Sequence, residues 1–186
     1  MNEIKKAIKI LISGGIKQKQ IYLLHCTSDY PASVNEINLL AINSMNSFFH
    51  LDCGYSDHTE GTEVSIAAVA LGAKIIEKHF TINKSMSGPD HKASLNPSEL
   101  TSMIKAIRNI EKALGNGNKS PTINEKKNLT FVRKSVVARK KINKGNIFKN
   151  NNICTKRPGD GLSPMNWDKI IGKKAKKIFL KDEKIY

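Results

Sequence analysis

Cysteine is scarce in this 186-residue chain, which contains three, and long hydrophobic runs are missing. The cysteines, Cys26, Cys53 and Cys154, are an odd number at wide spacings, which suits neither a disulfide framework nor a CxxC zinc site. No apolar stretch approaches the ~20 residues that a membrane-spanning helix needs. The N-terminal stretch is interrupted by Lys9 and lacks a small-residue cleavage site, so no signal peptide is predicted. These absences favour a soluble protein of the reducing cytoplasm without a membrane partner.

Acidic residues are few relative to basic ones: 16 against 31, for a formal net charge of +15. A basic field of this size attracts phosphate polymers regardless of their sequence. The lysines, however, are spread through both halves of the chain among asparagines and isoleucines. Neither a dense basic arm nor interleaved aromatic residues are present, and aromatics make up 6% of the chain. We therefore predict no nucleic-acid partner.

Helical spacing of apolar residues alternates with short apolar runs through residues 1–115. Helical spacing occurs at residues 2–13, 33–45, 61–72 and 96–115, and strand-like runs occur at 21–26, 48–56 and 73–80. The last helix has nearly complete end signals, with Asn96 as N-cap, Pro97 at the first helical position and Glu99 three residues after the cap. This alternation predicts an α/β fold with a parallel sheet and covering helices.

The composition changes after residue 115. Residues 116–129 are polar and rich in glycine, asparagine and lysine, which is typical of a linker. Beyond them, short β-branched runs are separated by turn signals such as KG, NN and PGDG. We predict an α/β domain at 1–115, a linker at 116–129 and a small β-rich domain at 130–186.

Polar residues follow each predicted strand at its carboxyl end, where the loops of a parallel sheet converge and ligands bind. The second and third strands are followed by His58 and His79. Because neighbouring strands lie roughly 4.8 Å apart, the two imidazoles can meet at one ion. Two histidines leave several coordination positions open, which suits a Lewis-acid role for a divalent cation better than a closed structural zinc site. The pattern therefore makes His58 and His79 candidate metal ligands.

The pattern alone leaves a simpler alternative open, because a strand histidine is more often a hydrogen-bonded core or rim residue than a metal ligand. His50, interpreted as the start of a strand, and His91, in a loop, are weaker candidates. Other polar residues near this edge also have ordinary roles as turn residues, packing rings, loop caps or strand-end charges. These residues are Ser28, Ser56, Tyr30, Asp90 and Glu77.

Several segments, in this order and at these spacings, give the chain a family resemblance. They are "LLHCTSDYP", "GYSDHT", "IIEKHFT", "SGPDHKASLNP", "SVVA" and "KRPGDG", of which "GPDHKAS" is especially specific. The chain resembles the sialic acid (N-acetylneuraminate) synthases over essentially its whole length. The resemblance implies a TIM-type barrel joined to an antifreeze-like (SAF, β-clip) domain. It also implies a transferase that condenses phosphoenolpyruvate with an N-acetylmannosamine-type sugar to a nine-carbon 2-keto acid, with release of phosphate.

The resemblance also implies roles for individual residues. His58 and His79 match the ligands of a divalent metal, usually Mn²⁺ with Mg²⁺ or Co²⁺ as alternatives, which polarises the sugar aldehyde for attack by C3 of phosphoenolpyruvate. Glu77 matches a carboxylate that faces the reacting centre. The matched substrate contacts are Ser28 and Ser56 for the phosphate of phosphoenolpyruvate, Tyr30 and Asp90 for the sugar hydroxyls, and Arg157 in the second domain. In the family this arginine enters the barrel of the partner subunit in a domain-swapped homodimer.

The matched segments correspond to the sixth, seventh and eighth strands of a barrel, so about three βα units are expected here and the first five strands are expected to be absent. Three strands alone would expose two edges and an apolar inner face. We therefore expect the chain alone to be aggregation-prone and inactive unless a separate N-terminal half docks to it. The alternative is a non-catalytic SAF-domain binding or dimerisation module with a vestigial half-barrel. The motifs suit N-acetylneuraminate and legionaminate synthases alike.

Overall fold

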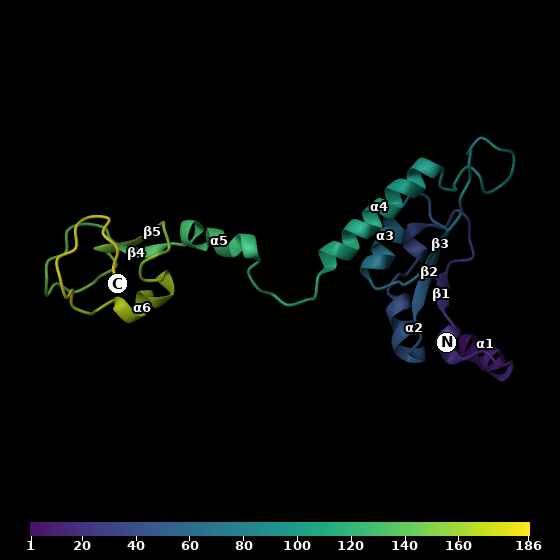
Figure 1. Cartoon of the computed structure of the whole chain (residues 1–186), viewed down its shortest axis with the longest axis horizontal. Helices are drawn as coiled ribbons and strands as arrows, with labels where there is room; N and C mark the ends of the chain where they lie inside the picture. The colour runs from purple at the N-terminus through teal and green to yellow at the C-terminus, as the bar shows by residue number, and fades with distance from the viewer. The chain divides into compact units, whose positions relative to one another are not determined.

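The computed structural model describes residues 1–186, which form two compact units, Met1–Asn118 and Lys119–Tyr186 (Figure 1). None of its helices combines the length and the hydrophobicity needed to span a bilayer. The first unit contains a parallel sheet with helices, and the second contains a small antiparallel sheet. The predicted α/β class is confirmed at this level.

Three parallel strands form the sheet of the first unit, in the order β1 (Leu23–Cys26), β2 (Cys53–Asp57), β3 (Ile76–Lys78). Every residue of the central strand β2 is buried, as expected for a parallel strand that is covered on both faces. β1 and β3 are shorter and partly exposed. Each of these two outer strands has one edge without a partner strand.

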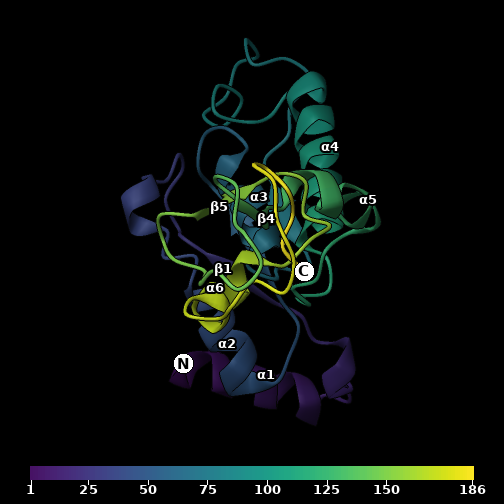
Figure 2. The same cartoon turned by 90° about the vertical axis from the view of Figure 1, so that its left-hand side faces the viewer.

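Four α-helices belong to the first unit: α1 (Asn2–Ser13), α2 (Ala41–Phe49), α3 (Glu63–Ala70) and α4 (Pro97–Leu114). Helices α2 and α3 pack on β2, and α4 packs on α3. The connection between β3 and α4 forms a loop that extends past the N-terminal end of α4 (Figure 2). The α4 end signals predicted from the sequence are present, since Asn96 and Glu99 form a reciprocal capping box.

Alternate residues of β2 define the two faces of the sheet. Cys53 and Tyr55 pack with Ile42, Met45 and Ala68, so their side of β2 faces the helices. A second cluster lies between α3 and α4, with Leu95, Met103 and Ile107 at its centre and Ile76 of β3 against it. Because strand side chains alternate, Ser56 on β2 and Glu77 on β3 lie on the opposite face. The helices and these clusters therefore fix the face on which Ser56 and Glu77 lie.

The interpretation of residues 48–56 as one strand was wrong at its start. Phe48 and Phe49 complete α2, and β2 begins only at Cys53. His50, expected to begin the strand, instead ends α2 in the left-handed conformation with φ 52°. The helix predicted at 33–45 likewise starts later, because Val34–Glu36 forms a short 3₁₀ turn before α2. Apolar periodicity alone did not locate this helix-to-strand boundary.

The second unit contains α5 (Ile123–Val132), β4 (Ser135–Ala138), β5 (Ile153–Lys156) and α6 (Trp167–Ile170), with a 3₁₀ turn at Pro164–Asn166. Strands β4 and β5 pair antiparallel. Its core includes residues from many parts of the unit: Val136, Ala138, Ile142, Phe148, Ile153, Ile170, Ala175, Phe179 and Ile185. The unit therefore encloses a hydrophobic cluster of its own.

Helix α5 lies partly within the segment 116–129 that the composition predicts to be a linker. Its start is fixed by a capping box in which Thr122 accepts from the backbone N–H of Glu125, and Glu125 accepts from that of Thr122. The carbonyl of Thr130 in this helix accepts a hydrogen bond from Gly159. A polar composition thus concealed a helix that is attached to the second unit.

Candidate active site at the ends of β2 and β3

His58 and His79 follow directly after β2 and β3, and the structure brings their rings together. The ring centroids are 5.2 Å apart with the planes at 86°, an edge-to-face arrangement. The carbonyl of His58 accepts a hydrogen bond from Ala32, and that of His79 accepts one from Leu95. The backbone therefore holds both residues at the same edge of the sheet, as the strand pattern predicts.

The Nδ1 atom of each histidine faces an oxygen of the protein. Nδ1 of His58 lies 3.1 Å from the carbonyl oxygen of Asp29, and Nδ1 of His79 lies 3.7 Å from Oδ2 of Asp90. The contact of His58 is of the kind that orients a metal-binding imidazole, whereas the separation at His79 is longer than a hydrogen bond. Close to Nε2 of His58, at 3.9 Å, is Sγ of the exposed Cys26.

Tyr30 completes an aromatic cluster with the two histidines. Its ring stacks on that of His79, with centroids 4.0 Å apart, and meets His58 edge-on at 5.6 Å. The Tyr30 hydroxyl lies 3.2 Å from Oγ of Ser94 and donates to the backbone carbonyl of Asp90 at 3.3 Å. Tyr30 thus joins the β1 loop to the loop that precedes α4.

Ser56 and Glu77 are cross-strand partners on the face opposite the helices. The Ser56 hydroxyl donates to Oε1 of Glu77 at 2.6 Å. Ser56 is buried, whereas Glu77 is exposed. The structure therefore places a hydroxyl and a carboxylate two residues before the two histidines, on the same side of the sheet.

The remaining predicted site residues are Ser28, Asp90 and Arg157. Ser28 is exposed in the loop after β1, next to Asp29. The side chain of Asp90 is 53% exposed, and its contact with His79 is a long one. Arg157 belongs to the second unit, where its Nε donates to the carbonyl of Val132 at 3.0 Å.

The remaining histidines have local partners. Nε2 of His25 lies 2.6 Å from the carbonyl oxygen of Ile37, and Nδ1 of His91 lies 2.8 Å from the hydroxyl of Thr81. His50 is the exposed residue that ends α2. No group of three or more histidine, cysteine, aspartate or glutamate side chains is arranged to hold a metal ion. The candidate donor set is therefore two imidazoles, which fits a divalent ion that keeps most of its positions for water or substrate.

A buried ion pair beside the site was not singled out from the sequence. Asp57 Oδ2 and Lys78 Nζ are 3.0 Å apart, and their side chains are 0% and 5% exposed. Burial favours the neutral form of Asp57, but hydrogen bonds from Ser65, Thr59 and Lys78 outweigh this effect and lower the pKa of the carboxyl. The positions of Asp57 and Lys78, each immediately before a candidate histidine, could have drawn attention to them.

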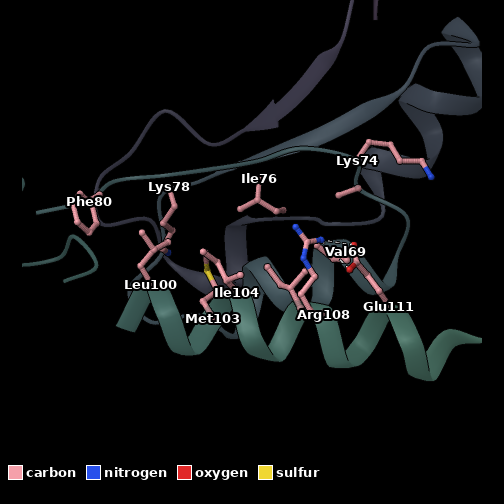
Figure 3. A pocket seen from close by; sticks show the side chains of 12 residues that line it. Val69, Lys74, Ile76, Lys78, Phe80, Leu100, Met103, Ile104, Arg108 and Glu111 are labelled. Carbon is pink, nitrogen blue, oxygen red and sulfur yellow. Dashed lines mark hydrogen bonds and ion pairs between the residues drawn. The ribbon is translucent and has the colours of Figure 1, made fainter. Parts of the chain in front are cut away.

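A groove runs along the other side of β3, between this strand and α4 (Figure 3). Ile76, Lys78 and Phe80 line one wall, and Leu100 and Ile104 of α4 belong to the other. Phe80 and Ile104 are 50% and 46% exposed. The groove is also lined by the charged residues Lys74, Arg108 and Glu111, and it is separate from the histidine cluster.

Two family profiles cover most of the chain: the NeuB family matches residues 1–119 and the SAF domain matches residues 133–186. The chain belongs to the NeuB family. The resemblance to sialic acid synthases with a SAF domain is thereby confirmed at the level of the family.

Two relatives of this NeuB family chain are named as synthases of a sugar acid or of its phosphate. It is 52% identical over 185 residues to the N,N'-diacetyllegionaminic acid synthase of Campylobacter jejuni, covering 100% of this chain and 55% of that protein. It is 36% identical over 189 residues to the N-acetylneuraminate-9-phosphate synthase of Homo sapiens, covering 92% of this chain and 52% of that protein. The chain thus spans about half the length of the curated relatives it matches.

A solved structure supports the same relationship. The spore coat polysaccharide biosynthesis protein SpsE of Bacillus subtilis matches with a TM-score of 0.57 and 34% sequence identity. The match covers 100% of this NeuB family chain and 57% of the SpsE chain. The two units therefore have counterparts in one longer protein.

Proposed function

We propose that the chain supplies the second half of a sugar acid synthase that joins phosphoenolpyruvate to a 2-acetamido sugar and releases phosphate. The observation that carries this proposal is the edge-to-face pair of His58 and His79 in a NeuB family chain, with Tyr30 stacked on His79. We favour N,N'-diacetyllegionaminic acid as the product, because the relative with that name is 52% identical over the whole chain.

Each site residue has a proposed role. His58 and His79 would hold a divalent ion, Mn²⁺ or alternatively Mg²⁺ or Co²⁺, which supplies Lewis-acid polarisation of a carbonyl oxygen. Glu77 would be the catalytic carboxylate facing the reacting carbon, held in place by the hydrogen bond from Ser56. The remaining proposed contacts are Ser28 and Ser56 with the phosphate of phosphoenolpyruvate, Tyr30 and Asp90 with sugar hydroxyls, and Arg157 with an acyl oxygen.

We further propose that the sheet of the first unit is part of a TIM-type barrel that is completed by additional polypeptide. The sheet has three strands and two open edges, and the groove between β3 and α4 lies beside one of the two outer strands. The matched relatives contain the additional length that such a barrel needs. In the complete protein, a domain-swapped homodimer would bring Arg157 of one subunit to the site of the other.

Reconstitution tests this proposal. The 186-residue chain is assayed for phosphate release from phosphoenolpyruvate, with Mn²⁺ and a 2,4-diacetamido or N-acetylmannosamine-type sugar, alone and after co-expression with the N-terminal part of the Campylobacter jejuni relative. We expect turnover only in the co-expressed sample. His58→Asn or His79→Asn should lower it about 10³-fold, since metal polarisation contributes several kcal/mol to transition-state stabilisation.

His50→Asn is the matched control, because it makes the same substitution at an exposed histidine outside the site. It should leave turnover within about twofold of the unmodified chain. Phosphate release by the 186 residues alone would contradict the need for further polypeptide. Equal activity of the His58 and His50 variants would contradict the assignment of His58 to the active site.

The second candidate is a non-catalytic module in which the SAF unit binds or dimerises. The observation that favours it is the separate core of the second unit, which includes Val136, Ile153 and Ile185. Absence of turnover in the co-expressed sample, together with a folded second unit, would support this candidate.

A further inference from the structure

Two cross-strand pairs of β2 and β3 stand next to one another and lead to the histidines. Ser56 is the partner of Glu77, and Asp57 is the partner of Lys78. His58 and His79 are the next residues on the two chains. Because side chains alternate along a strand, the Ser56 and Glu77 pair lies on the same face as the histidines, while Asp57 and Lys78 lie on the helix face.

Asp57 and Lys78 both form hydrogen bonds with Thr59, the residue that follows His58. Oδ1 of Asp57 accepts from the backbone N–H of Thr59 at 2.9 Å and from its hydroxyl at 2.8 Å. Oδ2 accepts from the hydroxyl of Ser65 in α3 at 2.5 Å. Lys78 donates to the carbonyl of Thr59 at 2.5 Å. His58 therefore lies between two residues that are joined to each other and to β3.

A buried ion pair is a poor source of stability, because desolvation of the two charges offsets much of their attraction. Such a pair can instead favour one register between the two strands over others. A slip of one residue between β2 and β3 would separate Asp57 from Lys78 and would move the histidines to non-equivalent positions. Since the slipped strand turns its side chains to the other face, Lys78 would leave Asp57 buried without its partner, so the pair disfavours such a slip.

We propose that Asp57 and Lys78 are positioning residues that hold the rings of His58 and His79 at one ion. The proposal deepens the proposed function, since the ion belongs to it, but the ring positions are measurable without any ion. Thr59 and Ser65 extend the same network from the turn after β2 and from α3. This network acts on the site through the backbone and touches neither the substrate nor the ion.

The test is the double variant Asp57→Asn with Lys78→Met in the 186-residue chain, co-expressed with the remainder of a relative if needed for solubility. Removing both charges at nearly constant volume leaves no buried charge unpaired. Two readouts are recorded: nuclear Overhauser effects between the rings of Tyr30, His58 and His79 without metal, and Mn²⁺ affinity by electron paramagnetic resonance. Thermal unfolding is measured alongside.

The matched control is Lys156→Met with Asp182→Asn, the same two substitutions in an exposed ion pair of the second unit, where the atoms are 2.6 Å apart. We expect the Asp57 and Lys78 variant to lose most of the inter-ring signals and to bind Mn²⁺ about tenfold or more weakly, as is usual for supporting residues of metal ligands. The control variant should change neither the inter-ring signals nor the Mn²⁺ affinity. The single variant Lys78→Arg keeps the positive charge beside Asp57. It should therefore keep more of the Mn²⁺ affinity than the double variant does.

The inference is overturned if the double variant keeps the inter-ring signals of the unmodified chain, or if it matches the control in both readouts. If the double variant fails to fold, Ser65→Ala, which removes a single hydrogen bond, decides instead: unchanged ring signals would contradict the proposal. An unmodified chain that shows the ring signals but binds no Mn²⁺ would contradict the proposed function and leave the ring-positioning result to stand by itself.

Discussion

The two units of this chain bury their apolar residues in different ways. The second unit closes around one cluster, and Ile142 and Phe179, far apart in the sequence, exchange two backbone hydrogen bonds of 2.9 Å across it. The first unit divides its apolar residues between two clusters and leaves both outer strands of its sheet with an open edge. From this difference we expect the second unit to fold by itself, and we expect the two open edges of the sheet in the first unit to need further partners.

Separate expression of the two units should have the largest effect and tests this comparison directly. We expect residues 119–186 to unfold cooperatively on heating and to remain soluble, because their core is closed. Residues 1–118 should aggregate as concentration rises, because the β3 edge and the groove along α4 are exposed. Circular dichroism melts and light scattering measure both outcomes. A soluble, cooperatively folding 1–118 fragment would contradict the comparison.

A core substitution in the second unit should have the next largest effect. Ile153 is 0% exposed and Ile123, in the same unit, is 76% exposed. Ile153→Ala should lower the free energy of unfolding of this unit by about 2–5 kcal/mol, because it removes buried methyl groups and leaves a cavity.

Ile123→Ala is the control and should change that free energy by less than about 0.5 kcal/mol. Urea denaturation of residues 119–186 gives both values. Similar losses for the two variants would mean that the cluster around Ile153 does not support the fold.

The smallest expected effect concerns the N-terminal end of α4. Hydrogen bonds from Lys84 and from the backbone of Asn96 lower the pKa of Glu99 from its ordinary value of 4.5. A lowered pKa in the folded state adds stability that is present above pH 4.5 and is lost as the pH falls through the folded value. Protection of α4 amides against hydrogen exchange should therefore weaken below about pH 4.5.

Glu99→Gln should reduce this protection at neutral pH, and the difference from the unmodified chain should disappear in acid. Glu111→Gln is the control, because it removes a carboxylate of the same helix outside the cap. An equal pH dependence in the Glu99 variant and the unmodified chain would rule out this role of the carboxylate.

Local signals in the sequence predicted some elements well and others poorly. The ends of α4 follow from Asn96, Pro97 and Glu99, because these residues satisfy the end of a helix through neighbours in the chain. The start of β2 and the conformation of His50 did not follow, because apolar residues at 48–56 fit a buried helix end and a buried strand equally well. The capping box at Thr122 was present in the sequence but was obscured by the polar composition around it.

The arrangement of the candidate site was also predictable only in part. The proximity of His58 and His79 could be predicted, because the carboxyl ends of neighbouring parallel strands lie at one edge of a sheet. The stacking of Tyr30 on His79 and the network around Asp57 depend on loops and on α3, whose positions no local pattern specifies.

The sequence by itself therefore determined the order of helices and strands in residues 1–115, the residues at the strand ends and the membership in a family, because each of these depends on local pattern or on motif. The tertiary structure decided which polar residues meet: Ser56 with Glu77, and Asp57 with Lys78 across the buried face. These contacts depend on the register between strands and on the packing of α3 against β2. Register and packing arise from contacts between residues distant in the chain, so neighbouring residues in the sequence do not specify them.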